Sequence, residues 1–178
     1  MGGIGLLTFI VAGCERKLTP EQAKAEQVPL RTLTAPEAQV LEALGEILLP
    51  GSAQAGIAHY LDQQLSGPAH DSMLILKYLG VSPPFTEFYR TGLSGVQNAA
   101  HTAYGKSLAD LDAQQGAALV HTLASGAEVK GWSGPPAGLF YFALRSDAID
   151  VVYGTQRGFD TLKVPYMAHI VPPSRWGE

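Results

Sequence analysis

The chain has 178 residues, of which 46% are hydrophobic and 16% are charged, and its mean hydropathy is +0.08. These values are typical of one globular domain with a substantial core, and they exclude an intrinsically disordered protein. The formal net charge of −4 is spread along the chain without a basic stretch, which argues against a nucleic-acid-binding protein.

Residues 1–14 are predicted to be a truncated export signal. The apolar run Ile4–Ala12 is much shorter than the roughly 20 residues of a membrane-spanning helix, and it fits the hydrophobic part of a signal instead. The segment Val11–Cys14 resembles the box of lipoprotein signals, so Cys14 is a candidate for lipidation. No Lys or Arg precedes the run, although a complete signal carries one. The alternative is the buried start of a first helix.

After a polar linker predicted at 15–32, residues 33–154 are predicted to form a helical domain. Capping boxes begin at Thr34 and Asp112, and apolar residues recur at helical spacing after each. Turn signals separate the helical segments, and no run alternates with the period of a strand. The expected helices are about 35–49, 55–66, 72–79, 85–104, 113–123 and 136–153. The fold class predicted is therefore all-α, an irregular bundle of about six helices.

Residues 155–178 are predicted to form an extended, proline-rich C-terminal arm. Its segment VPYMAHIVPPSRW carries large apolar side chains, while its three prolines exclude a regular helix or a central strand. Such a segment needs another surface to lie on, and we expect that surface to belong to a partner protein, with the protein's own helices as the alternative. Aromatic residues and arginine dominate protein interfaces, so the candidate contact residues are Tyr153, Phe159, Tyr166, Met167, Ile170, Arg175 and Trp176.

Motifs for catalysis are weak. Gly92–Gly95 and Gly131–Gly134 begin like a nucleophile elbow, but each lacks the final glycine in register, and we interpret both as loop or helix-packing positions. The sequence has neither a phosphate-binding loop nor a dinucleotide fingerprint. Its single cysteine excludes an internal disulfide, covalent haem c and a cysteine metal cluster, so we expect no cofactor on this chain.

The titratable residues offer only isolated candidates. No two histidines lie three or four residues apart, so no helix presents a histidine pair to a metal. His59 and Asp62 are spaced to pair on one helix face, although a structural role is favoured for them. If the chain were an enzyme with an unrecognised site, that site would use Asp147, Asp150 and His169.

Three segments resemble the gluconate 2-dehydrogenase subunit 3 family, in the order that the family has them. They are LTAPEAQVLEALGEILLPG at 33–51, GIAHYLDQQLSGP at 56–68 and FYRTGLSGVQNAAHTAYGKSLADLDAQQGAALVHTL at 88–123. The resemblance extends from Leu33 to Gly154. The ending after Gly154 is longer and more apolar than in many members, which leaves the substrate of the complex open.

The resemblance implies a non-catalytic small subunit of a periplasmic sugar, polyol or glycoside dehydrogenase complex. In such complexes, a large subunit of the glucose–methanol–choline type holds FAD and oxidises the substrate, and a c-type cytochrome subunit often takes the electrons. The small subunit binds the large one and supports its folding and twin-arginine export. Membrane contact is expected only through a lipid anchor or the complex. A free-standing periplasmic lipoprotein that acts as a binding module is the alternative.

Overall fold

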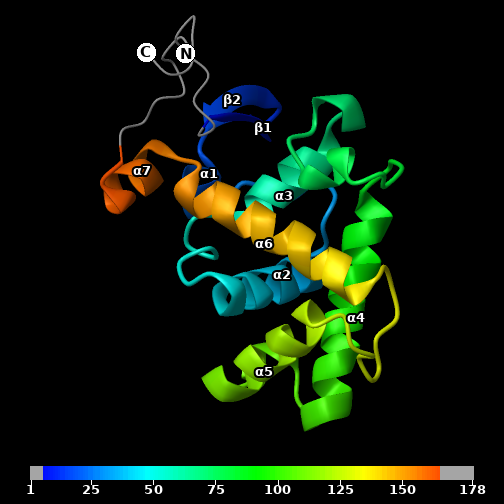
Figure 1. Cartoon of the computed structure of the whole chain (residues 1–178). Coiled ribbons are helices and arrows are strands. Elements are labelled where there is room, and N and C mark those ends of the chain that lie inside the picture. The colour runs from blue at the N-terminus through cyan, green and yellow to red at the C-terminus, as the bar shows by residue number, and fades with distance from the viewer. Residues whose placement is uncertain (1–5, 165–178) are drawn as a thin grey trace, which may run out of the picture.

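The structure is a computed structural model that describes residues 6–164 (Figure 1). Within this range, the chain forms seven α-helices, three short 3-10 helices and one two-stranded sheet. The α-helices are α1 (Pro20–Ala25), α2 (Ala35–Leu48), α3 (Ile57–Ser66), α4 (Thr86–Tyr104), α5 (Ala113–Ala124), α6 (Ala137–Tyr153) and α7 (Gln156–Leu162). The 3-10 helices are η1 (Ala69–Asp71), η2 (Ile75–Tyr78) and η3 (Leu108–Asp110). The prediction of a mostly helical, irregular bundle is confirmed.

The N-terminal segment forms a β-hairpin rather than a helix, with strands β1 (Leu7–Val11) and β2 (Cys14–Leu18). The turn residues Ala12 and Gly13 both have positive φ, as a two-residue hairpin turn of type I′ requires. Leu7 and Phe9 are buried and the residues between and after them are exposed, so the strand alternates. A run this short does not distinguish a strand from a helix by its apolar content alone, which is why the sequence did not reveal the hairpin.

Helix α1 lies within the segment predicted to be a polar linker. The Thr19 side chain accepts a hydrogen bond from the Gln22 N–H, and the Gln22 side chain accepts one from the Thr19 N–H, which makes a complete capping box. Ala23 is fully buried, and α1 packs against α3. Part of the expected linker therefore belongs to the folded unit.

Both predicted capping boxes are present. Thr34 begins α2 in a reciprocal pair with Glu37, whose carboxylate accepts the Thr34 N–H at 2.7 Å. Asp112 begins α5, where its carboxylate accepts the Gln115 N–H at 2.9 Å. Gly105 ends α4 with a φ of 67°, a left-handed conformation that glycine adopts without a steric penalty.

The prediction of an α-helix at 72–79 is wrong. Only the single 3-10 turn η2 lies there, and the burial alternates, with Leu74 and Leu76 fully buried and Met73 exposed. Two backbone donors bind side chains instead of helical carbonyls: the Met73 N–H donates to Gln64 Oε1 at 2.7 Å, and the Leu74 N–H donates to Ser72 Oγ at 3.2 Å. Side chains that compete for backbone donors oppose a regular helix, and this competition depends on a residue from α3.

Helix α6 is the centre of the packing, because it contacts α2, α3, α4, α5, α7 and η2. Figure 1 shows it crossing these elements with no described element drawn in front of it. Its residues Phe140, Leu144 and Ala148 are fully buried. The Phe140 ring lies 6.0 Å from Phe88 and 5.7 Å from Trp132, measured between ring centroids. None of the helices within residues 6–164 is both long and apolar enough to cross a membrane.

The C-terminal arm is helical where the structure describes it, so the prediction of an extended arm from residue 155 is wrong at its start. Thr155 caps α7 by accepting the Gly158 N–H at 3.1 Å. Gly158 is buried, and a Cβ at this position would overlap the backbone of Tyr153. The missing side chain therefore lets α7 fold against the end of α6. Residues 165–178, and the predictions made for them, lie outside the described residues.

Candidate partner-binding surface

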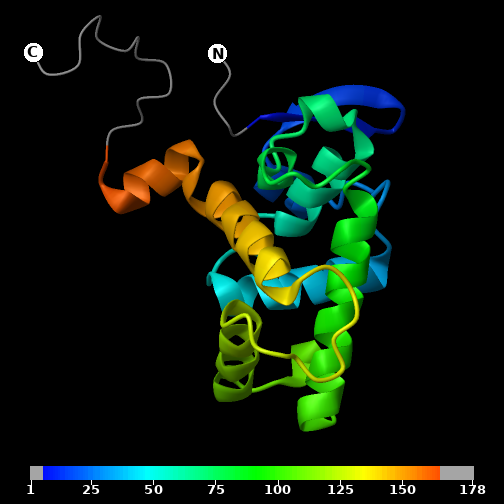
Figure 2. The same cartoon turned by 45° about the vertical axis from the view of Figure 1, so that its right-hand side comes forward.

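The predicted contact residues fall into two groups. Tyr153 ends α6 and Phe159 lies in α7, and both are half-buried. Figures 1 and 2 show α7 beyond the end of α6 and away from α4 and α5. The other candidates lie outside the described residues, as does His169; they are Tyr166, Met167, Ile170, Arg175 and Trp176. The described part of the candidate surface is therefore the α6–α7 corner.

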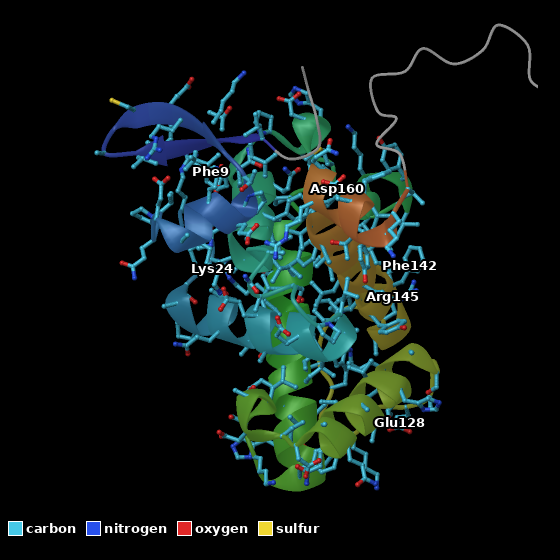
Figure 3. All side chains as sticks on the ribbon, turned by 90° about the vertical axis from the view of Figure 1, so that its left-hand side faces the viewer. Phe9, Lys24, Glu128, Phe142, Arg145 and Asp160 are labelled. Atoms are coloured by element: carbon cyan, nitrogen blue, oxygen red, sulfur yellow. The ribbon has the colours of Figure 1, made fainter. Side chains whose placement is uncertain are left out.

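One face of α6 is largely apolar and only partly covered. This outer stripe has residues three or four apart along the helix and consists of Leu139, Phe142, Ser146, Ile149 and Tyr153. Phe142 is 45% exposed, and Figure 3 shows Phe142 and Arg145 at the edge of the molecule. The other members are half-buried. A helix that is apolar on all sides is normally covered on all sides, so the stripe has the character of an interface.

A groove continues from this stripe. The α1–α7 groove has a volume of about 560 Å³ and three walls: the start of α1 with Leu6, the turn at 51–55, and the α6–α7 corner at 151–161. Val152 and Tyr153 line the groove, and Tyr153 also ends the outer stripe. Leu162 and Val164, which follow the groove wall in the chain, are 51% and 45% exposed. Stripe and groove thus form one continuous, largely apolar surface.

An ion pair crosses the groove from one wall to the other. Arg157 Nη1 of α7 lies 2.7 Å from Glu21 Oε1 of α1. The two side chains are 70% and 40% exposed, so the pair contributes little to stability. It joins two residues that are 136 positions apart in the sequence and so ties α7 to α1.

The carboxylates proposed for an alternative enzyme site lie inside the fold. Asp147 is fully buried in α6, and its Oδ2 accepts the Tyr89 hydroxyl hydrogen bond at 2.6 Å. No described residue hydrogen-bonds its Oδ1. Burial raises the pKa of Asp147 to about 7; the hydrogen bond from Tyr89 opposes this rise, and the charge of Asp150 adds to it. Asp147 has no access to solvent and so does not face a substrate from this position, while Asp150 is half-buried and His169 lies outside the described residues.

Other titratable groups near Asp147 also have raised pKa values. Burial raises the pKa of Tyr89 well above its usual range, and the neighbouring Asp147 adds to the effect. Burial likewise raises the pKa of Tyr60, as do the charges of Asp147 and Asp150. The pKa of Asp150, which is half-buried, is raised by burial too. The cluster joins α3, α4 and α6, with Tyr60, Tyr89 and Asp147 in the core.

His59 and Asp62 do not pair with each other. His59 Nε2 lies 3.1 Å from the carbonyl oxygen of Val28, and burial lowers the pKa of His59. The carboxylate of Asp62 accepts the N–H groups of three consecutive residues, Arg31, Thr32 and Leu33, at distances of 2.8 to 3.1 Å. Asp62 therefore fixes the chain that enters α2 against α3. The sequence spacing showed the two residues on one helix but not the distant backbone that each would meet.

A second polar contact holds the same region to α4. Arg90 Nε donates to Glu37 Oε1 at 2.6 Å, and Arg90 Nη2 donates to the Thr32 carbonyl at 3.2 Å. Burial raises the pKa of Glu37. Hydrogen bonds from Thr34 and Arg90, together with the Arg90 charge, lower this pKa by more, so it lies below its usual value. The capping residue of α2 is thus also a partner of α4.

The interpretation of the two Gly-x-Ser-Gly segments as packing positions is confirmed. Ser94 and Ser133 are both exposed, one on α4 and the other in the loop before α6. A Cβ on Gly92 would overlap the Phe140 ring, and a Cβ on Gly95 would lie 2.8 Å from the Ser133 carbonyl oxygen. These glycines let α4 approach α6 and the loop before it.

Other site types find little support in the described part of the chain. Residues 6–164 contain no group of three or more His, Cys, Asp and Glu side chains that could hold a metal ion. Cys14 is exposed at the first position of β2, directly after the hairpin turn. The outer stripe of α6 is the feature that sequence reasoning missed. Its signal was present, because only four of the 17 residues of α6 are polar.

Comparison with known proteins gave one match. The family model described as gluconate 2-dehydrogenase subunit 3 matches residues 35–169, which is most of the chain. Comparisons with curated proteins and with solved structures found no match. The matched range contains helices α2 to α7 and the whole outer stripe. Of the contact residues named from the sequence, it contains Tyr153, Phe159, Tyr166 and Met167, while Ile170, Arg175 and Trp176 lie beyond it.

Proposed function

The chain belongs to the gluconate 2-dehydrogenase subunit 3 family, and on this premise we propose that it is the non-catalytic small subunit of a periplasmic FAD-dependent dehydrogenase complex. Its partner is a large flavoprotein subunit of the glucose–methanol–choline type, which holds FAD and oxidises a sugar, polyol or glycoside. The small subunit supports the folding and twin-arginine export of this partner. A c-type cytochrome subunit is a further candidate member of the complex. No catalytic residue is assigned to the small subunit.

The observation that carries the proposal is the largely apolar, partly exposed outer stripe of α6. Phe142 is 45% exposed on the most central helix of the fold, and the same face continues through Tyr153 into the groove and α7. Stable interfaces have apolar cores that are enriched in aromatic residues. The proposed contact surface is therefore the outer stripe with Phe159, extended by Tyr166, Met167, Ile170, Arg175 and Trp176 from the end of the chain.

Lipidation of Cys14 is kept only as an alternative. Cleavage before Cys14 would remove β1, whose residues Leu7 and Phe9 are 8% and 6% exposed and belong to the hydrophobic core. A chain that keeps β1 is the better-packed protein. The free-standing lipoprotein module is the alternative function that a lipidated Cys14 would favour.

Co-expression tests the proposal. The subunit is produced together with the proteins encoded beside it, purified through an affinity tag, and examined for bound flavin by absorption. We expect a yellow complex that contains a large flavoprotein. Phe142→Gln should reduce the recovered flavoprotein at least about tenfold, because one buried aromatic anchor is worth more than 1.4 kcal/mol in many interfaces.

Tyr78→Gln is the matched control, because Tyr78 is 72% exposed on η2 and outside the outer stripe. This variant should recover as much flavoprotein as the unmodified chain. A colourless subunit purified alone under all conditions would contradict the proposed function. Equal losses of flavoprotein in both variants would show that the outer stripe is not the contact surface.

A further inference from the structure

We propose that residues 165–178, the C-terminal segment, bind in the α1–α7 groove of their own chain. The groove is concave rather than flat, and it encloses about 560 Å³ between α1, the turn at 51–55 and the α6–α7 corner. Its apolar lining comes from Leu6, Ala55, Val151 and Val152. The inference concerns the free subunit and does not require the proposed function.

The C-terminal segment starts at the edge of this groove. Gly158 and Thr161 of α7 line the groove, and the described chain ends three residues after Thr161. Lys163 has a φ of 55° and its N–H donates to the Asp160 carbonyl at 3.1 Å, while the Val164 N–H donates to the Phe159 carbonyl at 3.1 Å. This pattern of bonds turns the chain back at the end of a helix. The segment therefore leaves α7 beside the groove that it is proposed to fill.

The length of the segment suits this path. It has 14 residues, which span at most about 50 Å when extended. The 17 residues of α6 are about 25 Å long. The segment is thus long enough to cross the groove and to reach the outer stripe beyond Tyr153, which would make it part of the same apolar surface.

The chemistry of the segment matches the lining. It carries five large apolar residues, and its three prolines favour an extended conformation without internal hydrogen bonds. Apolar side chains on such a segment are buried only against another surface. The apolar members are Tyr166, Met167, Ile170, Val171 and Trp176.

Tethering favours this occupant over a segment of another protein. A segment joined directly to the groove wall has an effective concentration in the millimolar range, and closing so short a connection costs little chain entropy. A free partner segment would need correspondingly tighter contacts to displace it. The C-terminal segment is therefore the occupant to which we commit.

Trp176 reports on the docking in the full-length free subunit. Trp132→Phe leaves Trp176 as the only tryptophan. Its emission should be blue-shifted relative to a synthetic peptide of residues 165–178. In this background, Thr161→Arg should shift the emission back toward that of the peptide, because Thr161 lines the groove. Asp160→Arg is the matched control on the same helix; it does not line the groove and should leave the emission unchanged.

Disulfide formation gives a second readout that does not depend on Thr161→Arg folding. In a Cys14→Ser background, Gln54→Cys on the far wall is combined with Ile170→Cys. The intramolecular disulfide should form at least about tenfold faster than in the same chain unfolded in urea. Ser94→Cys combined with Ile170→Cys is the control, because Ser94 is exposed on α4 outside the groove, and it should show no such acceleration.

Three results would overturn the inference. Peptide-like emission of Trp176 without accelerated disulfide formation would show that the segment does not dock. Blue-shifted emission that Thr161→Arg leaves unchanged, with equal disulfide rates for both cysteine pairs, would place the segment elsewhere. A blue shift that grows with protein concentration together with dimers in size-exclusion chromatography would assign the groove to a second copy. Because no flavoprotein is present, these outcomes are independent of the co-expression result.

Discussion

The polar side chains on which the family resemblance rests are joined to distant parts of the backbone or to each other. Asp62 accepts three backbone N–H groups, and Tyr89 donates to Asp147 inside the core. Glu37 caps α2 and accepts from Arg90. Buried polar groups are costly unless they are hydrogen-bonded, so each of these positions tolerates few side chains. In the fold, these side chains position the helices and the segments that enter them.

Replacing the buried carboxyl should change how stability depends on pH. The folded-state pKa of Asp147 is raised to about 7 by burial, so the folded chain holds this proton more tightly than the unfolded chain. The stability contribution is fully present below about pH 4 and is lost as the pH rises to about 7. Asn does not ionise, so Asp147→Asn prevents this loss of stability at high pH, and its amide oxygen still accepts the Tyr89 hydrogen bond. We expect it to raise the free energy of unfolding by roughly 2–4 kcal/mol at pH 8 relative to the unmodified chain.

Urea unfolding at a series of pH values checks this expectation. The unmodified chain and Asp147→Asn should have similar stabilities near pH 4 and diverge above it. Tyr89→Phe keeps the carboxyl and removes its hydrogen bond, so this variant should be less stable by about 1–3 kcal/mol and should remain pH-dependent. Parallel pH profiles for the unmodified chain and Asp147→Asn would show that Asp147 is not the titrating group.

Asp62→Ala should be among the most destabilising single changes. It leaves three backbone donors near α2 without their acceptor, and hydrogen bonds to a charged group are worth about 1.5–3 kcal/mol each. We expect a loss of about 3 kcal/mol or more in the free energy of unfolding. Asp62→Asn retains one acceptor oxygen and should lose less. Glu87→Ala, at an exposed position of α4, is the control and should stay within about 0.5 kcal/mol.

At the scale of elements, close approach between α4 and α6 depends on a missing side chain. Gly92→Ala places a Cβ on the Phe140 ring, and overpacking of a filled core costs about 1–3 kcal/mol. Gly138→Ala, within α6, meets only the Leu123 carbonyl oxygen at 3.8 Å. This control should stabilise the chain by about 0.5–1 kcal/mol, because alanine is a better helix former. Thermal unfolding should rank Gly138→Ala above the unmodified chain and Gly92→Ala below it; the reverse order would contradict the packing argument.

The elements that the sequence predicted well are those with strong local signals. The boxes at Thr34 and Asp112 start α2 and α5, and Gly105 ends α4. The errors occur where a specific side-chain contact decides. The Met73 N–H of segment 72–79 binds the Gln64 side chain, and α7 forms against Tyr153 across the buried Gly158. The spacing of apolar residues does not report such contacts, even between residues close in sequence.

At the scale of the whole molecule, the end of the chain should matter for association rather than for folding. Helices α1 to α7 lie within residues 6–164 and pack against one another, so we expect deletion of residues 165–178 to leave the helical circular dichroism intact. The same deletion should weaken flavoprotein recovery at least about tenfold, because it removes the aromatic candidates Tyr166 and Trp176. Circular dichroism and co-purification measure the two effects separately. Loss of the helical signal would show that the segment belongs to the core.

The sequence by itself determined the helical class, the capped starts of the main helices and the resemblance to the family, because these depend on local spacing and on ordered motifs. The tertiary structure alone decided the hairpin, the partners of Asp62 and Asp147, and the partly exposed face of α6. The physical reason is that burial and hydrogen-bond partners come from residues far apart in the chain. An apolar helix shows in its sequence that it must be covered, and only the packed fold shows which of its faces remains open for a partner.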